Sequence, residues 1–570
     1  MTENTKTPNN MNIQSSFKPE GFNIPIVQFV NLDGNTSIDA PALPGATSTL
    51  SQTPAIREAE MLDLEGSTGK LLYFRTIQVE IGDVFYLRER DENHTENGIV
   101  VQIIKKEAAT YAQADNKSLW RLLTTVKAQQ FQRAHYESPE LIDLFLSATF
   151  KVRSAIVDGK WESAAGRVVT RNVDIFYINP KSLLENILVS RPNTDIDLGY
   201  FKDEPVKFSG QGFDKINLIT GMKGAGKSHI SKGIIDQTRQ RGMTSVVFDI
   251  NDEYGVLPDA ISFKPGKTLK FRLDRVEPKT FLDIINMLAP FSERTQYPAI
   301  AGVYRIFKER KEKHKPIDLN FLADQASVLF PGSATYLQTM RAAYIQSLEI
   351  IGTYNLFMTE AEIIDEDNAI RNSEYLVDNS LTSAFYSLDQ RKSAGVIVFS
   401  IGGLLPELQR AIVKLVLDAL KEICNRQNNK MIEDQTHVPV YPTVFFEEAH
   451  MYMDKEFINR LIPVIRHLGM NLFFVTNTPG ELPDSVFRLL DNLIMTRMVN
   501  DADINRVGTC GLSDSDTINS FAPELPEHHA LILSAKDGVT NNFPLVFNVR
   551  DFELPKSGVT RSMWKALAES

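Results

Sequence analysis

Cysteine is scarce in this chain of 570 residues, which has only Cys424 and Cys510. Two cysteines are too few for a disulfide framework or for a four-cysteine zinc site. We therefore expect both to be buried apolar side chains. The nine histidines are scattered without the spacing of metal ligands, so the sequence predicts no structural metal.

Long apolar runs are also missing from the sequence. The longest one, Gly395–Leu405, is far shorter than the roughly 20 residues that a membrane-spanning helix needs. The beginning of the chain, MTENTKTPNNMNIQSSFKPE, has neither the basic start nor the apolar stretch of a secretory signal. We therefore expect a cytoplasmic protein that has no membrane segment.

An excess of basic residues is absent too, because 61 lysines and arginines face 72 aspartates and glutamates, a net charge of −11. This balance excludes a whole surface coated with nucleic acid, but it leaves room for a local basic channel. The basic run KERKEKHK at Lys308–Lys315 could touch nucleic-acid phosphates. Its two glutamates are more typical of a solvated helix end.

The residue composition and the pattern of apolar residues change along the chain. Residues 1–66 are rich in Asn, Thr, Ser and Pro and predict an extended or disordered arm. Short runs rich in Val, Ile, Tyr and Phe, with a helical stretch near 117–146, predict a small β domain over 67–185. Continuous apolar runs then alternate with helical spacing, which indicates a doubly wound α/β core. We place this core at 186–274 and 391–550, a helical insertion at 275–390, and a tail at 551–570.

The most specific motif is GMKGAGKS at Gly221–Ser228, which fits the phosphate loop G-x-x-x-x-G-K-[ST]. It follows a predicted strand and opens a predicted helix, whose amino-terminal end attracts phosphate. We expect Lys227 to reach the β- and γ-phosphates and Ser228 to ligate magnesium. The predicted cofactors are ATP and Mg²⁺, with nucleotide contacts from Gly221, Lys223, Gly224, Ala225, Gly226, Lys227, Ser228 and His229.

Acidic residues end two other apolar runs. TVFFEEAH places Glu447 and Glu448 together at a strand end. We expect Glu447 to hold the magnesium and Glu448 to orient or deprotonate the attacking water, with a solvated strand end as the alternative. VVFDINDEYG places Asp249 at another strand end, followed by Glu253. Both could face the nucleotide, although Asp249 could equally cap a turn.

Three further polar residues could assist catalysis. Asn477 follows the strand NLFFVT, and its amide could sense the γ-phosphate unless it forms an ordinary turn. Arg466 lies near the end of a predicted helix at 454–468, and Arg497 lies in the strand predicted next. Either arginine could complete a neighbouring subunit's site by neutralising the transferring phosphate, with surface ion pairing as the alternative.

These motifs, in this order, resemble those of the HerA group of hexameric ATPases, relatives of the FtsK DNA pumps. The resemblance runs from about Lys70 to Asp551 and includes EIGDVFYL, GMKGAGKS, FDINDEYG, FFEEAH, RHLG and FVTNTP. It implies a RecA-like P-loop NTPase core with a helical insertion, an amino-terminal HAS-type β-barrel, and a homohexamer with ATP sites between subunits. Such rings pump double-stranded DNA through their pore and commonly seat a nuclease or other effector on the barrel. Many bacterial members act in antiphage defence.

The chain departs from the usual HerA pattern at three positions. Glu447 stands where the family usually has Asp, and Asn477 stands where it usually has Gln. Arg466 falls on the arginine of a degraded Gly-Arg-Lys-x-Gly pattern. These departures affect the expected rate of hydrolysis more than nucleotide binding. Two functions follow: an ATP-driven DNA translocase or helicase, or a ring scaffold that assembles and activates a partner effector.

Overall fold

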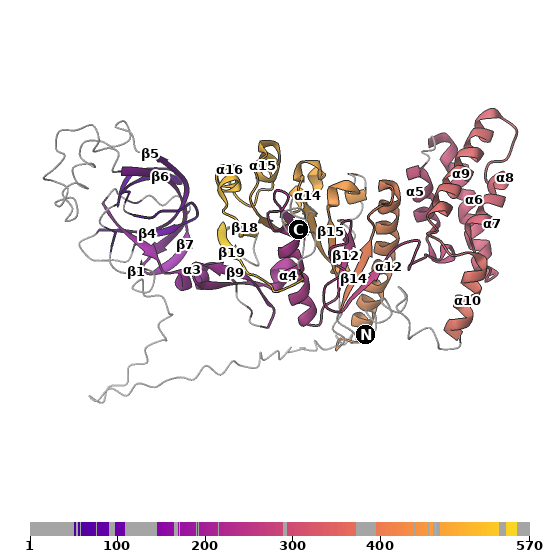
Figure 1. Ribbon diagram of the computed structural model, residues 1–570, viewed down its shortest axis with the longest axis horizontal. Coiled ribbons are helices and arrows are strands. Elements are labelled where there is room, and N and C mark those ends of the chain that lie inside the picture. The colour runs from indigo at the N-terminus through magenta and orange to yellow at the C-terminus, as the bar shows by residue number, and fades with distance from the viewer. Residues whose placement is uncertain are drawn as a thin grey trace, which may run out of the picture. The chain divides into compact units, whose positions relative to one another are not determined.

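A computed structural model describes the chain between residues 51 and 555, with gaps of which the longest are 109–144 and 372–394. Most of the arm expected at 1–66, and most of the helix expected near 117–146, therefore lies outside the described residues. Figure 1 shows the described elements coloured along the chain. Within these ranges, none of the helices has both the length and the apolar character that crossing a membrane requires.

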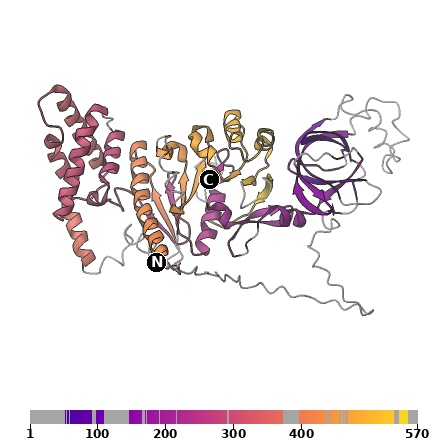
Figure 2. The ribbon, with the colours of Figure 1, turned by 180° about the vertical axis from the view of Figure 1, so that it is seen from behind.

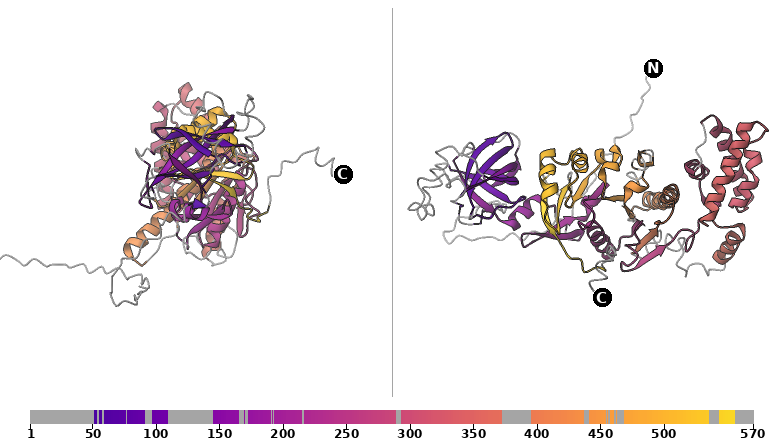
Figure 3. Two further views of the ribbon diagram at one scale, coloured as in Figure 1. Left: turned by 90° about the vertical axis from the view of Figure 1, so that its left-hand side faces the viewer. Right: turned by 45° about the horizontal axis from the view of Figure 1, so that its top comes forward.

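The first sheet is antiparallel and has eight strands, in the order β1-β8-β4-β5-β6-β3-β2, with β7 paired to β6. Register shifts in the β5–β6 pair, between Val100 and Val101 and between Ile103 and Lys105, are irregularities of the kind that bend a sheet. The strands curl around a shared apolar interior (Figures 1 and 3). The strand bounds are β1 Ser51–Gln52, β2 Ala59–Glu65, β3 Thr68–Phe74, β4 Val84–Glu89, β5 Gly98–Ala108, β6 Phe145–Val157, β7 Lys160–Ser163 and β8 Val173–Ile178.

The second sheet has eleven strands in the order β10-β9-β19-β18-β17-β11-β16-β15-β12-β14-β13. The strands from β17 to β13 run parallel, and those from β10 to β17 pair in antiparallel fashion. This arrangement confirms the predicted α/β core. Its strands are β9 Asp195–Phe201, β10 Glu204–Ser209, β11 Ile216–Thr220, β12 Ser245–Asp249, β13 Ala260–Phe263, β14 Val396–Ser400, β15 Thr443–Glu447, β16 Asn471–Thr476, β17 Asn492–Met495, β18 His529–Ser534 and β19 Leu545–Val549.

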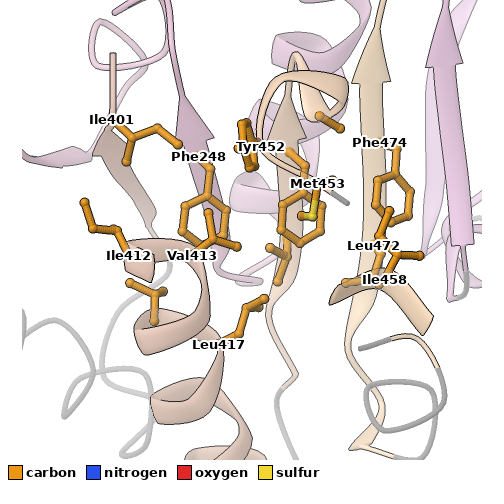
Figure 4. Packing of buried hydrophobic residues seen from close by; sticks show 14 of the residues in the cluster. Phe248, Ile401, Ile412, Val413, Leu417, Tyr452, Met453, Ile458, Leu472 and Phe474 are labelled. Atoms are coloured by element: carbon orange, nitrogen blue, oxygen red, sulfur yellow. The ribbon is translucent and has the colours of Figure 1, made fainter. Parts of the chain in front are cut away.

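Helices cover both faces of the parallel strands, and every residue of β11, β12, β15, β16 and β17 is buried. Neighbouring residues of a strand point to opposite faces. Val247 thus packs in one cluster with residues of α4 (Lys227–Gln240), whereas Phe248 packs in another with residues of α12 (Pro406–Glu433). In Figure 4, Ile412, Val413 and Leu417 of α12 lie beside Phe248.

The remaining helices flank these elements. Both cysteines are buried free thiols, as expected, and burial raises the pKa of Cys424 to about 12. The helices are α3 Pro180–Ile187, α5 Pro278–Leu288, α6 Glu293–Glu312, α7 Leu319–Asp324, α8 Ala326–Leu329, α9 Thr335–Thr353, α10 Glu360–Arg371, α14 Asp484–Arg488, α15 Asp501–Gly508 and α16 Ser515–Glu524.

From residue 278 to 371, the described part of the segment between β13 and β14 consists of the helices from α5 to α10 and the short loops between them. Figure 2 shows these helices from behind. The insertion is tied to the core, because Thr280 Oγ1 of α5 donates a 2.6 Å hydrogen bond to Asp418 Oδ2 of α12. The basic run at the end of α6 is largely exposed, and within it Lys308 pairs with Glu312 and Lys313 with Glu309. These pairs favour the solvated helix end.

Two buried asparagines join the starts of β11 and β17 to the loop before β11. Asn217 Nδ2 donates to the carbonyl oxygens of Phe213 (3.0 Å) and Leu472 (3.1 Å). Asn492 Nδ2 donates to the Gly212 carbonyl (2.6 Å) and to Asn217 Oδ1 (2.7 Å). A buried polar group that loses its hydrogen-bond partner keeps the full cost of its desolvation. Replacing either amide should therefore destabilise the fold.

We therefore expect Asn217→Leu to lower the free energy of unfolding by roughly 2–4 kcal/mol, because the substitution removes one hydrogen bond from each of three buried polar groups. Urea unfolding followed by circular dichroism would measure the loss. Asn548→Ala, at an exposed position on β19 of the same sheet, is the control and should stay within about 0.5 kcal/mol of the parent chain. A loss equal to that of the control would show that the buried amides do not matter for stability.

Candidate functional site

The phosphate-loop motif forms the turn between β11 and α4, as predicted. Gly221, Gly224 and Gly226 have φ values of 153°, 81° and 96°, a region that side chains other than glycine rarely adopt. A Cβ atom added at Gly221 would lie 1.8 Å from Thr496 Oγ1. The first glycine is thus required both by its backbone conformation and by the close approach of the residue after β17.

Lys227 is 7% exposed and opens α4. Its Nζ donates to the carbonyl oxygens of Gly221 (3.0 Å) and Met222 (3.2 Å), so the loop's own main chain holds the ammonium group. Burial lowers the pKa of Lys227, although the nearby carboxylates of Glu448 and Glu447 favour its charged form. A cation desolvated within a glycine-rich loop suits an anionic ligand.

Glu447 is the last residue of β15 and is 2% exposed. The Ser228 hydroxyl lies 3.5 Å from its Oε1, and the Tyr254 hydroxyl donates a 2.6 Å hydrogen bond to its Oε2. Burial, assisted by the negative charge of Glu448, raises the pKa of Glu447 to about 8. The structure thus brings together Ser228 and Glu447, the two predicted magnesium ligands. Their oxygen atoms fit a hard divalent cation.

Glu448 follows β15 with φ 47° and ψ 48°, in the left-handed region. Its side chain is 16% exposed, and its Oε2 lies 3.5 Å from His450 Nδ1. The same ring nitrogen lies 2.9 Å from Thr476 Oγ1 at the end of β16. Glu448 is therefore largely enclosed at the carboxyl edge of the parallel strands. Ligand-binding sites of open α/β sheets lie at this edge.

Asp249 ends β12 and is fully buried. Its carboxylate accepts hydrogen bonds from the backbone N–H groups of Asn251 (3.1 Å) and Tyr254 (2.9 Å), so the turn-capping alternative describes its contacts. Burial raises the pKa of Asp249. Glu253 Oε2 lies 3.8 Å from Lys232 Nζ on α4. A direct nucleotide contact by either carboxylate stays a prediction.

Asn477 directly follows β16 and is half-buried. Arg497 lies two residues beyond the end of β17 rather than within the strand, which corrects the prediction for that residue. Beyond the end of the strand, the Arg497 carbonyl accepts a 2.8 Å hydrogen bond from the Met222 N–H of the phosphate loop. The Arg497 side chain is exposed and its Nε donates to the Pro523 carbonyl. Arg466 lies outside the described residues.

The remaining predicted loop contacts have different surroundings. Lys223 is exposed and Ala225 is half-buried. His229 Nε2 lies 2.9 Å from the Arg550 carbonyl, and its ring centroid is 5.1 Å from that of Phe552. The imidazole therefore packs against the segment after β19, and a nucleotide contact for His229 stays a prediction.

Sequence reasoning missed four residues around Glu447 and Glu448. Tyr254 contacts the Glu447 carboxylate, and Lys232 Nζ lies 5.4 Å from the centroid of the Tyr254 ring. The Tyr452 hydroxyl donates to the Glu447 carbonyl at 3.1 Å, and His450 stands beside Glu448. Both tyrosines and His450 lie within or beside the acidic motifs. Their closeness in sequence to the predicted ligands is the signal from which they could have been found.

Residues 197–420 match the family model described as Helicase HerA, central domain. Three solved structures resemble parts of the chain at low identity. They are VirB4 of Thermoanaerobacter pseudethanolicus (TM-score 0.47, 12% identity, 64% of this chain and 97% of that chain), an unbound form of the bacterial conjugative coupling protein TrwB (0.46, 9%, 66% and 93%), and the genome packaging NTPase B204 from Sulfolobus turreted icosahedral virus 2 (0.27, 10%, 59% and 99%).

No curated protein matches the sequence. The match to the family model covers the phosphate loop, β12 with its acidic turn, the helical insertion and the first part of α12. Those are the regions in which the sequence motifs GMKGAGKS and FDINDEYG lie. The resemblance deduced from the motifs is thereby confirmed for residues 197–420, which are similar to the central domain of HerA helicases.

Proposed function

We propose that the chain is an ATP-hydrolysing motor that moves double-stranded DNA through the pore of a homohexameric ring. The observation that carries this proposal is the meeting of the phosphate loop with the acidic end of β15. Lys227 lies buried in the loop, and Ser228 stands 3.5 Å from Glu447, with Glu448 next in the chain. A loop for phosphates opposite two carboxylates is the arrangement that ATP and Mg²⁺ require.

Each side chain then has one task. Lys227 would bind the β- and γ-phosphates, and Ser228 and Glu447 would hold Mg²⁺, which neutralises charge on the phosphate oxygens when bound. Glu448 would accept the proton of the attacking water, and Asn477 at the end of β16 would sense the γ-phosphate. Asp249 and Glu253 would shape the turn beside the nucleotide. The arginine of a neighbouring subunit, Arg466 or Arg497, would neutralise the transferring phosphate.

The curved eight-stranded sheet is, in this proposal, the HAS-type barrel at about 67–185. A nuclease or other effector would dock there, because the faces of the motor are occupied by neighbouring subunits and DNA, whereas short β loops are free to vary. The complex would act in antiphage defence or DNA end processing in the cytoplasm.

A second candidate function is a ring scaffold that assembles and activates the effector with little turnover of its own. The observation that favours it is Glu447, which is longer than the usual Asp and whose pKa is raised to about 8 by burial. Magnesium would have to displace a proton from Glu447, so hydrolysis should rise with pH.

DNA-stimulated ATP hydrolysis by the purified full chain separates the two functions. A motor should hydrolyse ATP faster when double-stranded DNA is added, and the stimulation should fall as salt rises, because phosphate contacts are screened. A scaffold should show a low rate that DNA leaves unchanged, while nucleotide alters the amount of effector bound. Absence of any ATP binding would overturn both functions.

A ring with shared sites predicts complementation between two inactive variants. Arg466→Ala protein should bind ATP almost normally but hydrolyse it poorly, because the missing charge acts in the transition state. Mixing it with Lys227→Ala protein should restore part of the activity, since some interfaces then receive both an intact loop and an intact arginine. No rescue, with subunit exchange confirmed, would transfer the role to Arg497 or to a site complete in one chain.

A further inference from the structure

A buried tyrosine contacts the carboxylate that we assign to magnesium. The Tyr254 hydroxyl donates to Glu447 Oε2 at 2.6 Å, whereas Ser228 Oγ lies 3.5 Å from Glu447 Oε1. The two oxygens of one carboxylate are thus approached by two different hydroxyl groups. Tyr254 is fully buried, so water does not take the place of its hydroxyl group.

The Tyr254 ring is itself fixed from two elements. Its backbone N–H donates to Asp249 Oδ2 at 2.9 Å, which ties the residue to the end of β12. On the other side, Lys232 of α4 places its Nζ 5.4 Å from the ring centroid and 3.8 Å from Glu253 Oε2. Because α4 begins at the phosphate loop, the tyrosine is held by the same helix that carries Lys227 and Ser228.

A glutamate at the end of β15 needs such a restraint more than an aspartate does. Its side chain has one more rotatable bond, so several rotamers compete for the single arrangement that faces Ser228. The 2.6 Å hydrogen bond from the Tyr254 hydroxyl is short and directional, and it selects one of these rotamers. Without the Tyr254 hydroxyl group, Glu447 Oε2 would stay buried and would lose this hydrogen-bond donor.

We propose that Tyr254 is a positioning residue that fixes Glu447 so that its other oxygen, Oε1, faces Ser228 and the magnesium ion of the bound nucleotide. This inference rests on the proposed nucleotide site and adds a residue to it. Tyr254 does not touch the nucleotide in this scheme and acts only through Glu447.

The chain offers a matched control in Tyr452. This tyrosine is 2% exposed, and its hydroxyl also donates to Glu447, but to the backbone carbonyl oxygen at 3.1 Å. Tyr254→Phe and Tyr452→Phe therefore delete the same atom from the same kind of buried ring. They differ in whether the lost hydrogen bond reaches the Glu447 carboxylate or its main chain.

The test measures binding of a fluorescent ADP to the full chain, once with Mg²⁺ and once with EDTA. The parent chain should bind ADP more tightly with Mg²⁺. Tyr254→Phe should lose most of this enhancement, since partners that orient a metal ligand change metal affinity by about 10- to 100-fold. Its affinity in EDTA should equal that of the parent chain, and Tyr452→Phe should match the parent chain in both conditions.

Three results would overturn the inference: an unchanged magnesium enhancement in Tyr254→Phe, an equal loss in Tyr452→Phe, or a loss of ADP affinity in EDTA. The last result would indicate damage to the loop rather than to the magnesium ligand. Glu447→Asp supplies a second arm, because its shorter carboxylate should make the further change Tyr254→Phe nearly neutral. A parent chain that binds no ADP in either condition would instead refute the nucleotide site itself, and this inference with it.

Discussion

ATP hydrolysis should fall by at least about a hundredfold in Lys227→Ala, because the change removes the buried cation that we assign to the transferring phosphate. The fold should survive, since in the described part of the chain the Lys227 ammonium donates to the carbonyl oxygens of Gly221 and Met222, which belong to the loop itself. Phosphate release from ATP, measured with purified protein at equal concentrations, checks the activity, and thermal unfolding checks the fold.

Lys207→Ala is the control for this experiment, because Lys207 is an exposed lysine on β10 of the same sheet. It should hydrolyse ATP at the parent rate. Hydrolysis at the parent rate in Lys227→Ala as well would refute the phosphate-loop assignment.

A different loss is expected in Glu448→Gln, which should bind ATP as the parent chain does and hydrolyse it about 10²- to 10⁴-fold more slowly. The amide keeps the shape of the side chain beside His450 but cannot accept the proton of the attacking water. Single-turnover assays would show ATP retained on the protein. Weaker ATP binding in this variant would contradict the role of general base and indicate a phosphate or magnesium contact instead.

The core strands were predictable because burial on both faces demands apolar residues at every position. β12, β15, β16 and β17 all appear in the sequence as continuous apolar runs, and their carboxyl ends carry the polar residues of the site. The phosphate loop was predictable for a related reason: its glycines are imposed by local backbone geometry. Burial of a strand and the backbone conformation of a loop both depend on residues that are adjacent in the sequence.

Contacts between distant segments were not predictable in this way. Tyr254 meets Glu447 only because β12 and β15 pair in parallel, and His229 meets Phe552 only because the chain returns past β19 to α4. β13 also escaped prediction, since it is four residues long and mostly half-exposed, without a continuous apolar run. The hydrogen bond between the Arg497 carbonyl and the phosphate loop also joins segments that are far apart in the sequence, and no local pattern encodes it.

The helices from α5 to α10 join two strands that are parallel neighbours, β13 and β14. A connection between such strands must cross a face of the sheet and needs a dozen or more residues. These helices therefore form an enlarged crossover connection between the two strands and are not an insertion in a surface loop. A two-residue turn could not take their place, because such a turn joins antiparallel strands, whereas β13 and β14 run parallel.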